Sequence, residues 1–276
     1  MKLFKYLLGM GLCLSIAKAT VAQTVRNYNP IIPDLIADPS IVKFGDTFYC
    51  YATTDGYDKG LATSGPPVLW QSKDLVNWQK HGSAFRTAHQ GKFFDTPSKS
   101  ASIVTSLING KQVITKVNGK YLMYWGEKFI NLAWSDDLIN WTPELNDKGE
   151  LLAIVSPRAG FFDSQLTECG PPAVLTDKGI VVLYNGKNEP GKKGDERYTA
   201  NTYAAGQVMF DAKDPKKVLQ RLDEPFFVPQ ESFEKSGQYP AGTVFVEGLV
   251  YFKDKWFLYY GCADSRVGVA IYEPKN

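Results

Sequence analysis

Short apolar, aromatic-rich runs separated by turns of Gly, Asp or Lys recur along this chain. Four segments share the pattern of two strand-like runs joined by a tight turn: 42–51, 116–126, 175–186 and 250–261. Such runs, joined by a turn of this composition, are typical of β-hairpins. The sequence therefore predicts four hairpins at similar points of a repeated β-sheet unit.

Two further self-similarities support a repeat architecture. The polar turn at 72–78 (SKDLVNW) matches that at 135–141 (SDDLINW), and the segment 93–96 (FFDT) is echoed at 161–164 (FFDS). Both long turns follow an apolar strand and end on a Trp that can cap the outer edge of a sheet. No window shows sustained helical periodicity, and 24 Gly and 16 Pro punctuate the chain. We predict an all-β fold.

The N-terminus resembles a secretory signal peptide. Lys2 and Lys5 precede an apolar run over 6–17, and the small residues at 20–22 offer a cleavage site before Gln23. Leu12, before Cys13, argues against lipid attachment. We expect a signal peptide at 1–22 and an exported protein that is periplasmic or extracellular. No later stretch reaches the roughly 20 apolar residues of a membrane-spanning helix.

The mature region 23–276 fits one domain. Its length of about 254 residues gives roughly 50 per unit for a five-bladed β-propeller, in which each blade is a four-stranded sheet. No clear fifth hairpin is visible in the sequence. The fifth blade is either degenerate or completed by the N-terminal residues 23–35.

Charge and cysteine content narrow the function classes. The net charge of +2 provides no strong field for nucleic acid or an anionic membrane. Cleavage leaves Cys50, Cys169 and Cys262, each in or beside an apolar strand, so three buried free thiols are expected, with one disulfide plus one thiol as the alternative. With only two histidines in the chain we expect no metal site and no cofactor. We also expect a monomer.

Three of the four hairpins are preceded by an acid: Asp38, Glu168 and Glu247. In a propeller these positions lie at the start of the innermost strands, on the same face as the loops that follow the hairpins. The loops contribute further polar residues: Asp55, Tyr57, Glu127, Glu189, Arg197, Asp264 and Arg266. The second repeat differs, because it enters its strand as Ser-Ala-Ser at 100–102.

The acids suggest carboxylate catalysis. Glu168 and Glu247 are embedded among apolar or small residues, where an unpaired carboxylate is costly. Burial and mutual repulsion push one pKa upward and leave the other group ionised, as glycoside hydrolysis requires. A buried salt bridge is the rival interpretation, and Asp38, before Pro39, could simply be a turn or cap residue.

These residues resemble two families of five-bladed propeller glycoside hydrolases. The stretch with Asp38-Pro39-Ser40 and the turn at 72–78 is similar to glycoside hydrolase family 43. The second half resembles family 130, through Gly-Pro-Pro-Ala at 170–173, Tyr-Asn-Gly at 184–186, Asp-Pro-Lys-Lys-Val at 214–218, 225–231 and 259–264. The resemblance implies acid–base catalysis without a cofactor on a β-mannoside, arabinofuranoside, xyloside or related sugar.

The resemblance also implies roles for individual residues. Asp38 matches the general-base aspartate of family 43, and Glu247-Gly248 is similar to that family's Glu-Gly general acid. Glu168 falls in a segment that contributes to the active site in family 130. That family's catalytic aspartate would be expected near Ser100, where this chain has no acid, and no set of phosphate-binding cations is evident.

We therefore expect an exo-acting glycosidase that inverts the anomeric configuration. Glu168 and Glu247 are the expected principal carboxylate pair, and Asp38 is a third acid. Expected sugar contacts are Trp70, Trp125, Tyr57 and Arg266, with Asp95 and Asp163 in reserve. Core packing is an equal alternative for both Trp residues. The alternative functions are a carbohydrate-binding propeller without turnover, an interaction propeller and a glycoside phosphorylase.

Overall fold

The computed structural model describes residues 101–274 continuously. Before them it describes residues 32, 37–44, 46–53, 55–56, 60–64, 68–83, 93, 96, 98 and 100. The chain divides into two compact units, Met1–Pro33 and Asp34–Asn276, and the account below concerns the second. The predicted signal peptide at 1–22 lies outside the described residues, as do 23–31 and 33–35.

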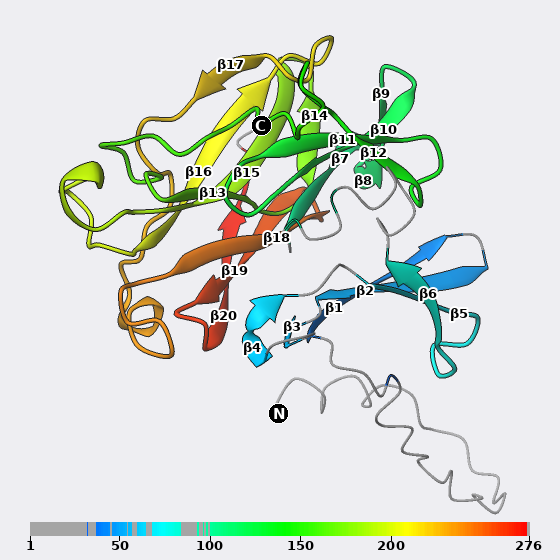
Figure 1. Cartoon of the computed structure of the whole chain (residues 1–276), viewed down its shortest axis with the longest axis horizontal. Helices are drawn as coiled ribbons and strands as arrows, with labels where there is room; N and C mark the ends of the chain where they lie inside the picture. The colour runs from blue at the N-terminus through cyan, green and yellow to red at the C-terminus, as the bar shows by residue number, and fades with distance from the viewer. Residues whose placement is uncertain are drawn as a thin grey trace, which may run out of the picture. The chain divides into compact units, whose positions relative to one another are not determined.

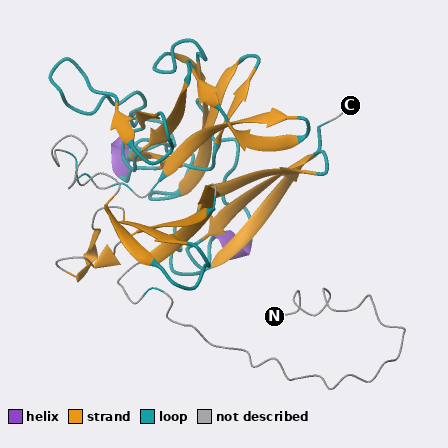
Figure 2. Ribbon diagram, turned by 90° about the vertical axis from the view of Figure 1, so that its right-hand side faces the viewer, coloured by secondary structure: helices purple, strands orange, loops and turns teal. Residues whose placement is uncertain are grey.

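Strands and loops make up nearly all of the described structure, as the ribbon in Figure 2 shows. The first repeat pairs β1 (Ala37–Phe44), β2 (Thr47–Thr53), β5 (Val68–Ser72) and β6 (Gln79–Ser83) in that order. A small hairpin of β3 (Asp55–Gly56) and β4 (Gly60–Ser64) is inserted between β2 and β5.

The second repeat runs through β7 (Ala101–Ile108), β10 (Lys120–Trp125), β11 (Asn131–Ser135) and β12 (Trp141–Pro143). The third contains β13 (Leu166–Cys169), β14 (Ala173–Thr176), β15 (Gly179–Lys187), β16 (Tyr203–Phe210) and β17 (Val218–Arg221). The fourth contains β18 (Val244–Phe252), β19 (Lys255–Cys262) and β20 (Arg266–Tyr272). Two 3-10 turns, η3 (Gly191–Lys193) and η4 (Ser232–Glu234), are the only helical elements among the described residues.

The all-β prediction is confirmed, and each predicted hairpin is present as an antiparallel pair: β1–β2, β9–β10, β14–β15 and β18–β19. The described residues thus hold four successive sheet repeats (Figure 1). Five blades, and completion of one by residues 23–35, stay predictions. No helix in the described part of the chain is long and apolar enough to cross a membrane.

One hairpin escaped the sequence analysis. β7 turns back at Asn109-Gly110 into β8 (Lys111–Ile114), which is followed by β9 (Lys116–Val117). Both turn residues have positive φ, 50° and 70°, as a two-residue type I′ hairpin turn requires. The Asn-Gly dipeptide is the signal that could have revealed it.

The second and third repeats are joined edge to edge. β7 pairs with β10 near its start, then runs parallel to β14 over Val104–Ser106. Three hydroxyl groups of the second repeat donate across the junction, each to a residue 68 positions further along. Ser100 reaches the Glu168 carboxylate, Ser102 the Gly170 carbonyl at 3.0 Å and Thr105 the Ala173 carbonyl at 2.7 Å. We call Ser100, Ser102 and Thr105 the hydroxyl seam.

The principal core lies between these two repeats. Tyr124, Phe162, Tyr184 and Phe210 are among its largest side chains, and Tyr124 stacks on Phe210 at 4.6 Å between ring centroids. A smaller cluster, which includes Val246 and Tyr260, packs the fourth repeat. Cys50, Cys169 and Cys262 are buried thiols outside any disulfide, which confirms the prediction of three buried thiols. Burial raises the pKa of each thiol, so these groups resist ionisation.

The two polar turns have the same bonding pattern as well as similar sequences. In the second, the Ser135 hydroxyl accepts the Leu138 N–H at 2.8 Å and Asp137 Oδ1 accepts the N–H groups of Ile139 and Asn140. The Trp141 indole N–H then donates to the Leu138 carbonyl at 3.2 Å. The first turn repeats this set with Ser72, Asp74 and Trp78. Partial burial opposes ionisation, but hydrogen bonds from Asn140 lower the pKa of Asp137 to about 2.

We expect Asp137→Ala to lower the melting temperature by about 2–4 °C at pH 7, the effect of losing about 1 kcal/mol of capping. The pKa of Asp137 is lower in the folded protein than its ordinary value of 3.8, so its contribution is complete above pH 4 and is lost as pH falls toward 2. Asp136→Ala is the matched control, because it removes only an exposed pair with Lys120. Equal melting temperatures for the two variants in calorimetry at pH 7 would contradict this role.

Candidate active site

Each predicted acid lies where an inner strand is interrupted. The pairing of β1 with β2 shifts between Ala37 and Ser40, on either side of Asp38, and that of β18 with β19 shifts between Val246 and Gly248, at Glu247. Glu168 lies one residue before the end of β13, after which the inner segment breaks before β14. Bulges and breaks re-aim side chains and are common beside active sites.

The second repeat has neither an acid nor a bulge at this point. Ala101, Ser102 and Ile103 pair in regular register with Trp125, Tyr124 and Met123. Its inner strand is therefore regular where the others are irregular, and it carries the hydroxyl seam in place of a carboxylate.

Glu168 is the best-defined acid of the site. Its side chain is buried, with the residue 2% exposed, and it is directly paired with Asn185 of β15. The Ser100 hydroxyl donates to Glu168 Oε1. Two backbone bonds fix the same corner, from the Gly126 N–H to the Ser100 carbonyl and from the Cys169 N–H to the Gly126 carbonyl, both 3.1 Å.

Gly126 is required at this corner. Its φ is +129°, and a Cβ atom there would lie 2.0 Å from the Phe129 carbonyl oxygen. A larger residue would displace the backbone that holds Ser100 and Cys169, and with it the orientation of Glu168.

Aromatic and charged groups gather on the Glu168 face of the third sheet. By register, Glu168, Asn185, Lys187 and Tyr203 share that face, because Asn185 pairs with Glu168 and Lys187 with Tyr203. The Lys187 ammonium lies over the Tyr203 ring at 5.1 Å and over the Tyr239 ring at 5.5 Å. These rings meet edge to face at 5.4 Å between centroids.

The Tyr203 phenol resists ionisation. Burial raises the pKa of its phenol well above the usual value, and the charge of Glu168, followed by the groups of Tyr239, Glu127 and Asp264, acts in the same direction. Glu127 follows β10 of the second repeat, and Asp264 follows β19 of the fourth. Negative charge from the segments after two of the hairpins therefore acts on the Tyr203 phenol.

Glu247 lies on the neighbouring strand. It is exposed, whereas Val244 and Val246 of the same strand are buried. Val246 is held by both polar atoms of the Asn185 side chain, at 2.7 and 3.1 Å. Phe245 contacts the Tyr203 ring at 5.5 Å. Glu247 thus projects from a strand that contacts the Glu168 face directly.

The other predicted residues have varied outcomes. Asp38 belongs to β1, but its side chain lies outside the described residues, as do Tyr57 and Asp95.

Trp70 is buried with 9% exposure, and Trp125 packs in a core cluster with Ala133 and Trp141. The burial of both rings favours the core-packing alternative for the two Trp residues. Arg266 starts β20 and donates to the Ser236 carbonyl at 2.8 Å.

Asp163 belongs to a structural ion network. It is fully buried, and its oxygens accept from Arg158 at 3.0 and 3.2 Å, from Arg221 at 2.6 Å and from the Tyr184 hydroxyl at 2.6 Å. Both carboxylate oxygens are thus occupied by protein donors. The interpretation as a reserve sugar contact is replaced by that of a core ion pair.

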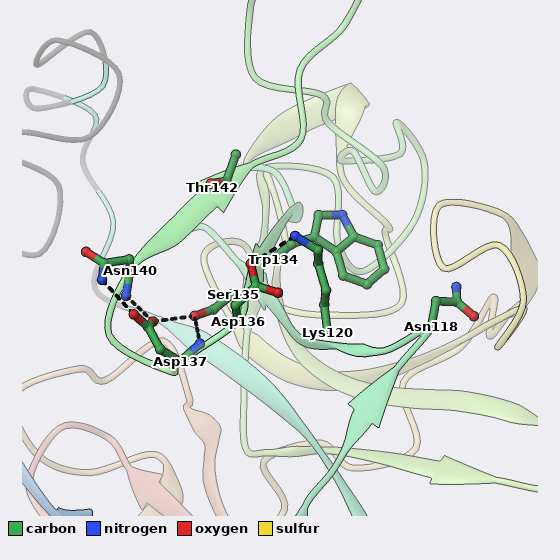
Figure 3. Close-up of a pocket in the computed structure, with 8 residues that line it drawn as sticks. All are labelled: Asn118, Lys120, Trp134, Ser135, Asp136, Asp137, Asn140 and Thr142. Carbon is green, nitrogen blue, oxygen red and sulfur yellow. Dashed lines mark hydrogen bonds and ion pairs between the residues drawn. The ribbon is translucent and has the colours of Figure 1, made fainter.

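A separate cleft of about 540 Å³ lies at the edge of the second repeat and is drawn in Figure 3. Its polar groups belong to the turn at 135–141, where Ser135, Asp137 and Asn140 bond to one another, and to the exposed pair of Lys120 with Asp136. None of the three predicted acids lines it. We therefore place the candidate site at Glu168.

Sequence analysis missed Tyr203, Tyr239 and Lys187. Lys187 ends β15 and Tyr203 begins β16, so the two lie at the ends of the connection that contains the predicted loop at 187–198. Their position at its two ends was the available signal. No described group of three His, Cys, Asp or Glu side chains is arranged to hold a metal ion.

Sheet repeats that present a buried carboxylate beside aromatic rings are typical of carbohydrate-active β-sheet proteins. Residues 19–275 match the family described as beta-1,4-mannooligosaccharide phosphorylase. The chain belongs to this family, glycoside hydrolase family 130.

Three relatives illustrate the likeness. The chain is 30% identical to a 1,2-beta-oligomannan phosphorylase of Thermoanaerobacter sp. (strain X514) over 241 residues, 87% of this chain and 69% of that protein. A solved structure is 56% identical in sequence to this chain, with a TM-score of 0.78. The match covers 87% of this chain and 66% of that chain. Its description states that the family of mannoside phosphorylases contains glycoside hydrolases that target beta-1,2 mannosidic linkages in Candida mannan.

The third relative shares the fold alone. It is a family 43 arabinoxylan arabinofuranohydrolase from Bacillus subtilis, 20% identical with a TM-score of 0.51, and it covers 90% of this chain and 52% of that chain. The resemblance to families 43 and 130 that the sequence indicated is thereby confirmed.

We expect Asp163→Asn to destabilise the protein by about 3–5 kcal/mol, because Arg158 and Arg221 would lose a buried counter-charge. Asp223→Asn is the matched control. It removes an exposed partner of the same Arg158 and should cost less than about 1 kcal/mol. Urea unfolding of both variants measures the difference, and similar losses would contradict a core role for Asp163.

Proposed function

We propose that this protein is an exported glycoside hydrolase that removes mannosyl units from the end of a β-mannoside chain. The observation that carries the proposal is the buried Glu168 carboxylate on the same sheet face as Tyr203, whose ring meets that of Tyr239 edge to face. Aromatic faces beside carboxylates suit a sugar, whose ring has apolar faces and hydroxyl edges. The hydrolases described for the 56%-identical relative support the mannosidic substrate.

In the proposed reaction Glu168 is the general base and Glu247 is the general acid. The Glu168 carboxylate takes a proton from water as the water oxygen bonds to the anomeric carbon. The bond from that carbon to the glycosidic oxygen breaks, and the oxygen leaves with a proton from the Glu247 carboxyl. This single displacement inverts the anomeric configuration. Asp38 is a third acid that activates water or tunes a neighbour.

Water is favoured over phosphate because three arginines of the described structure are already paired with acids. Arg158 and Arg221 are bonded to the buried Asp163, and Arg197 pairs with Asp195 and Glu224. A phosphate beside Glu168 would need cationic donors to offset two like charges.

Phosphorolysis is the second candidate. It is favoured by the 1,2-beta-oligomannan phosphorylase relative and by Lys187, a cation on the Glu168 face. A carbohydrate-binding protein without turnover is the third.

Incubation with β-1,2- and β-1,4-mannooligosaccharides, with and without inorganic phosphate, separates the candidates. We expect free mannose at a rate that phosphate does not change. Mannose 1-phosphate formed only with phosphate would replace the proposal by phosphorolysis. Binding without any product would support the non-catalytic alternative.

Glu168→Gln and Glu247→Gln test the residue roles. Each should lower kcat by about 100-fold or more with little change in KM, because a positioned acid or base contributes about 10²–10⁴-fold. Asp177→Asn, which changes an exposed acid in the turn between β14 and β15, is the control and should leave kcat unchanged. Full activity in both site variants would remove the two glutamates from the mechanism.

Export belongs to the same proposal and rests on the pattern of residues 1–22. We expect the protein recovered outside the cytoplasm to begin at Gln23. N-terminal sequencing of that material measures this, and a chain beginning at Met1 would contradict it.

A further inference from the structure

Ser100 occupies the place that an acid holds in the first repeat. The segments 38–42 (DPSIV) and 100–104 (SASIV) share Ser-Ile-Val, and counting back from it aligns Ser100 with Asp38. Backbone pairing supports the alignment, since Ser40 pairs with Tyr51 and Ser102 pairs with Tyr124. Ser100 is therefore at a site position by repeat geometry, although serine cannot act there as an acid.

The Ser100 hydroxyl forms a hydrogen bond with the neighbouring third repeat. Its Oγ donates to Glu168 Oε1, and its carbonyl accepts from Gly126, whose own carbonyl accepts from Cys169, next to Glu168. These contacts form a closed circuit of hydrogen bonds through Ser100, Gly126, Cys169 and Glu168. Both the position and the orientation of that carboxylate depend on the start of the second repeat.

We propose that Ser100 is a positioning residue that holds the buried Glu168 carboxylate ionised and aimed, so that Glu168 serves as the proton acceptor for the attacking water. This inference rests on the proposed function and assigns the two carboxylates their roles. Glu247, which is exposed, remains as the proton donor.

Opposing effects determine whether the Glu168 carboxylate is ionised. Burial and nearby negative charge both disfavour an ionised carboxylate, whereas a hydroxyl donor favours it. Ser100 donates to Glu168, and Lys187 and Tyr203 lie on the same sheet face. An acid at position 100 would add repulsion, whereas serine supplies a donor. The hydroxyl thus offsets the cost of burying the Glu168 carboxylate.

Glu168 can be titrated directly, without reference to turnover. Carbon-13 NMR of the glutamate carboxyl carbons, with Glu168 assigned by its loss in Glu168→Gln, gives its titration midpoint. We expect the midpoint to rise by about 1–2 pH units in Ser100→Ala, since a hydrogen bond to a charged group is worth about 1.5–3 kcal/mol and one unit is about 1.4 kcal/mol. Ser100→Thr, which keeps the hydroxyl, should restore the wild-type midpoint.

Ser102→Ala is the matched control. Ser102 belongs to the same hydroxyl seam but donates to a backbone carbonyl, so its loss should affect stability without moving the Glu168 midpoint. Ser100→Asp should raise the midpoint further than Ser100→Ala. An unchanged midpoint in Ser100→Ala, or an equal shift in Ser102→Ala, would overturn the role of Ser100.

The pH dependence of kcat/KM is the second readout. The acid limb should move to higher pH in Ser100→Ala, by the amount that NMR gives, and return in Ser100→Thr. If the midpoint shifts but the acid limb does not, Glu168 is not the proton acceptor and the inference fails. If wild type turns over no glycoside, the proposed function fails, while the NMR result still decides whether Ser100 controls Glu168.

Discussion

The hydroxyl seam is the interaction on which the site depends. Ser100, Ser102 and Thr105 bond to residues 168, 170 and 173, and this constant offset keeps the inner segments of two repeats in register. A regular β7 is needed for that register, because a bulge would turn successive side chains to the other face. The second repeat therefore carries small hydroxyl residues, and its neighbour carries the buried acid. Close approach of the inner segments is also visible at Gly170, where a Cβ atom would lie 3.0 Å from the Val246 carbonyl oxygen.

Local features were predictable from sequence because their causes are local. Hairpins follow from apolar runs and turn residues, and the Ser-Asp-Asn-Trp turns repeat the same hydrogen bonds wherever the sequence repeats. The positions of Glu168 and Glu247 beside inner strands followed from their spacing to the hairpins. The contribution of Ser100 did not follow, because a bond across 68 residues depends on how two repeats dock.

Other features needed the three-dimensional pairing. The partners of Asp163 include Arg221, 58 residues away, so its network left no local pattern. Trp125 could equally serve a core or a sugar platform by residue type, and only its burial with Trp141 distinguishes the two. Lys187 and Tyr203 meet through pairing of β15 with β16 across a long loop. Residue chemistry was readable, but the neighbours of each side chain were not.

A crystal structure of Glu247→Gln with a bound β-mannooligosaccharide tests the central claim most directly. The account predicts a terminal mannosyl unit between Glu168 and position 247, against Tyr203 or Tyr239. A water held by Glu168 should lie about 3–3.5 Å from the anomeric carbon. A sugar bound in the cleft beside Trp134, or phosphate beside Glu168 in place of that water, would contradict it.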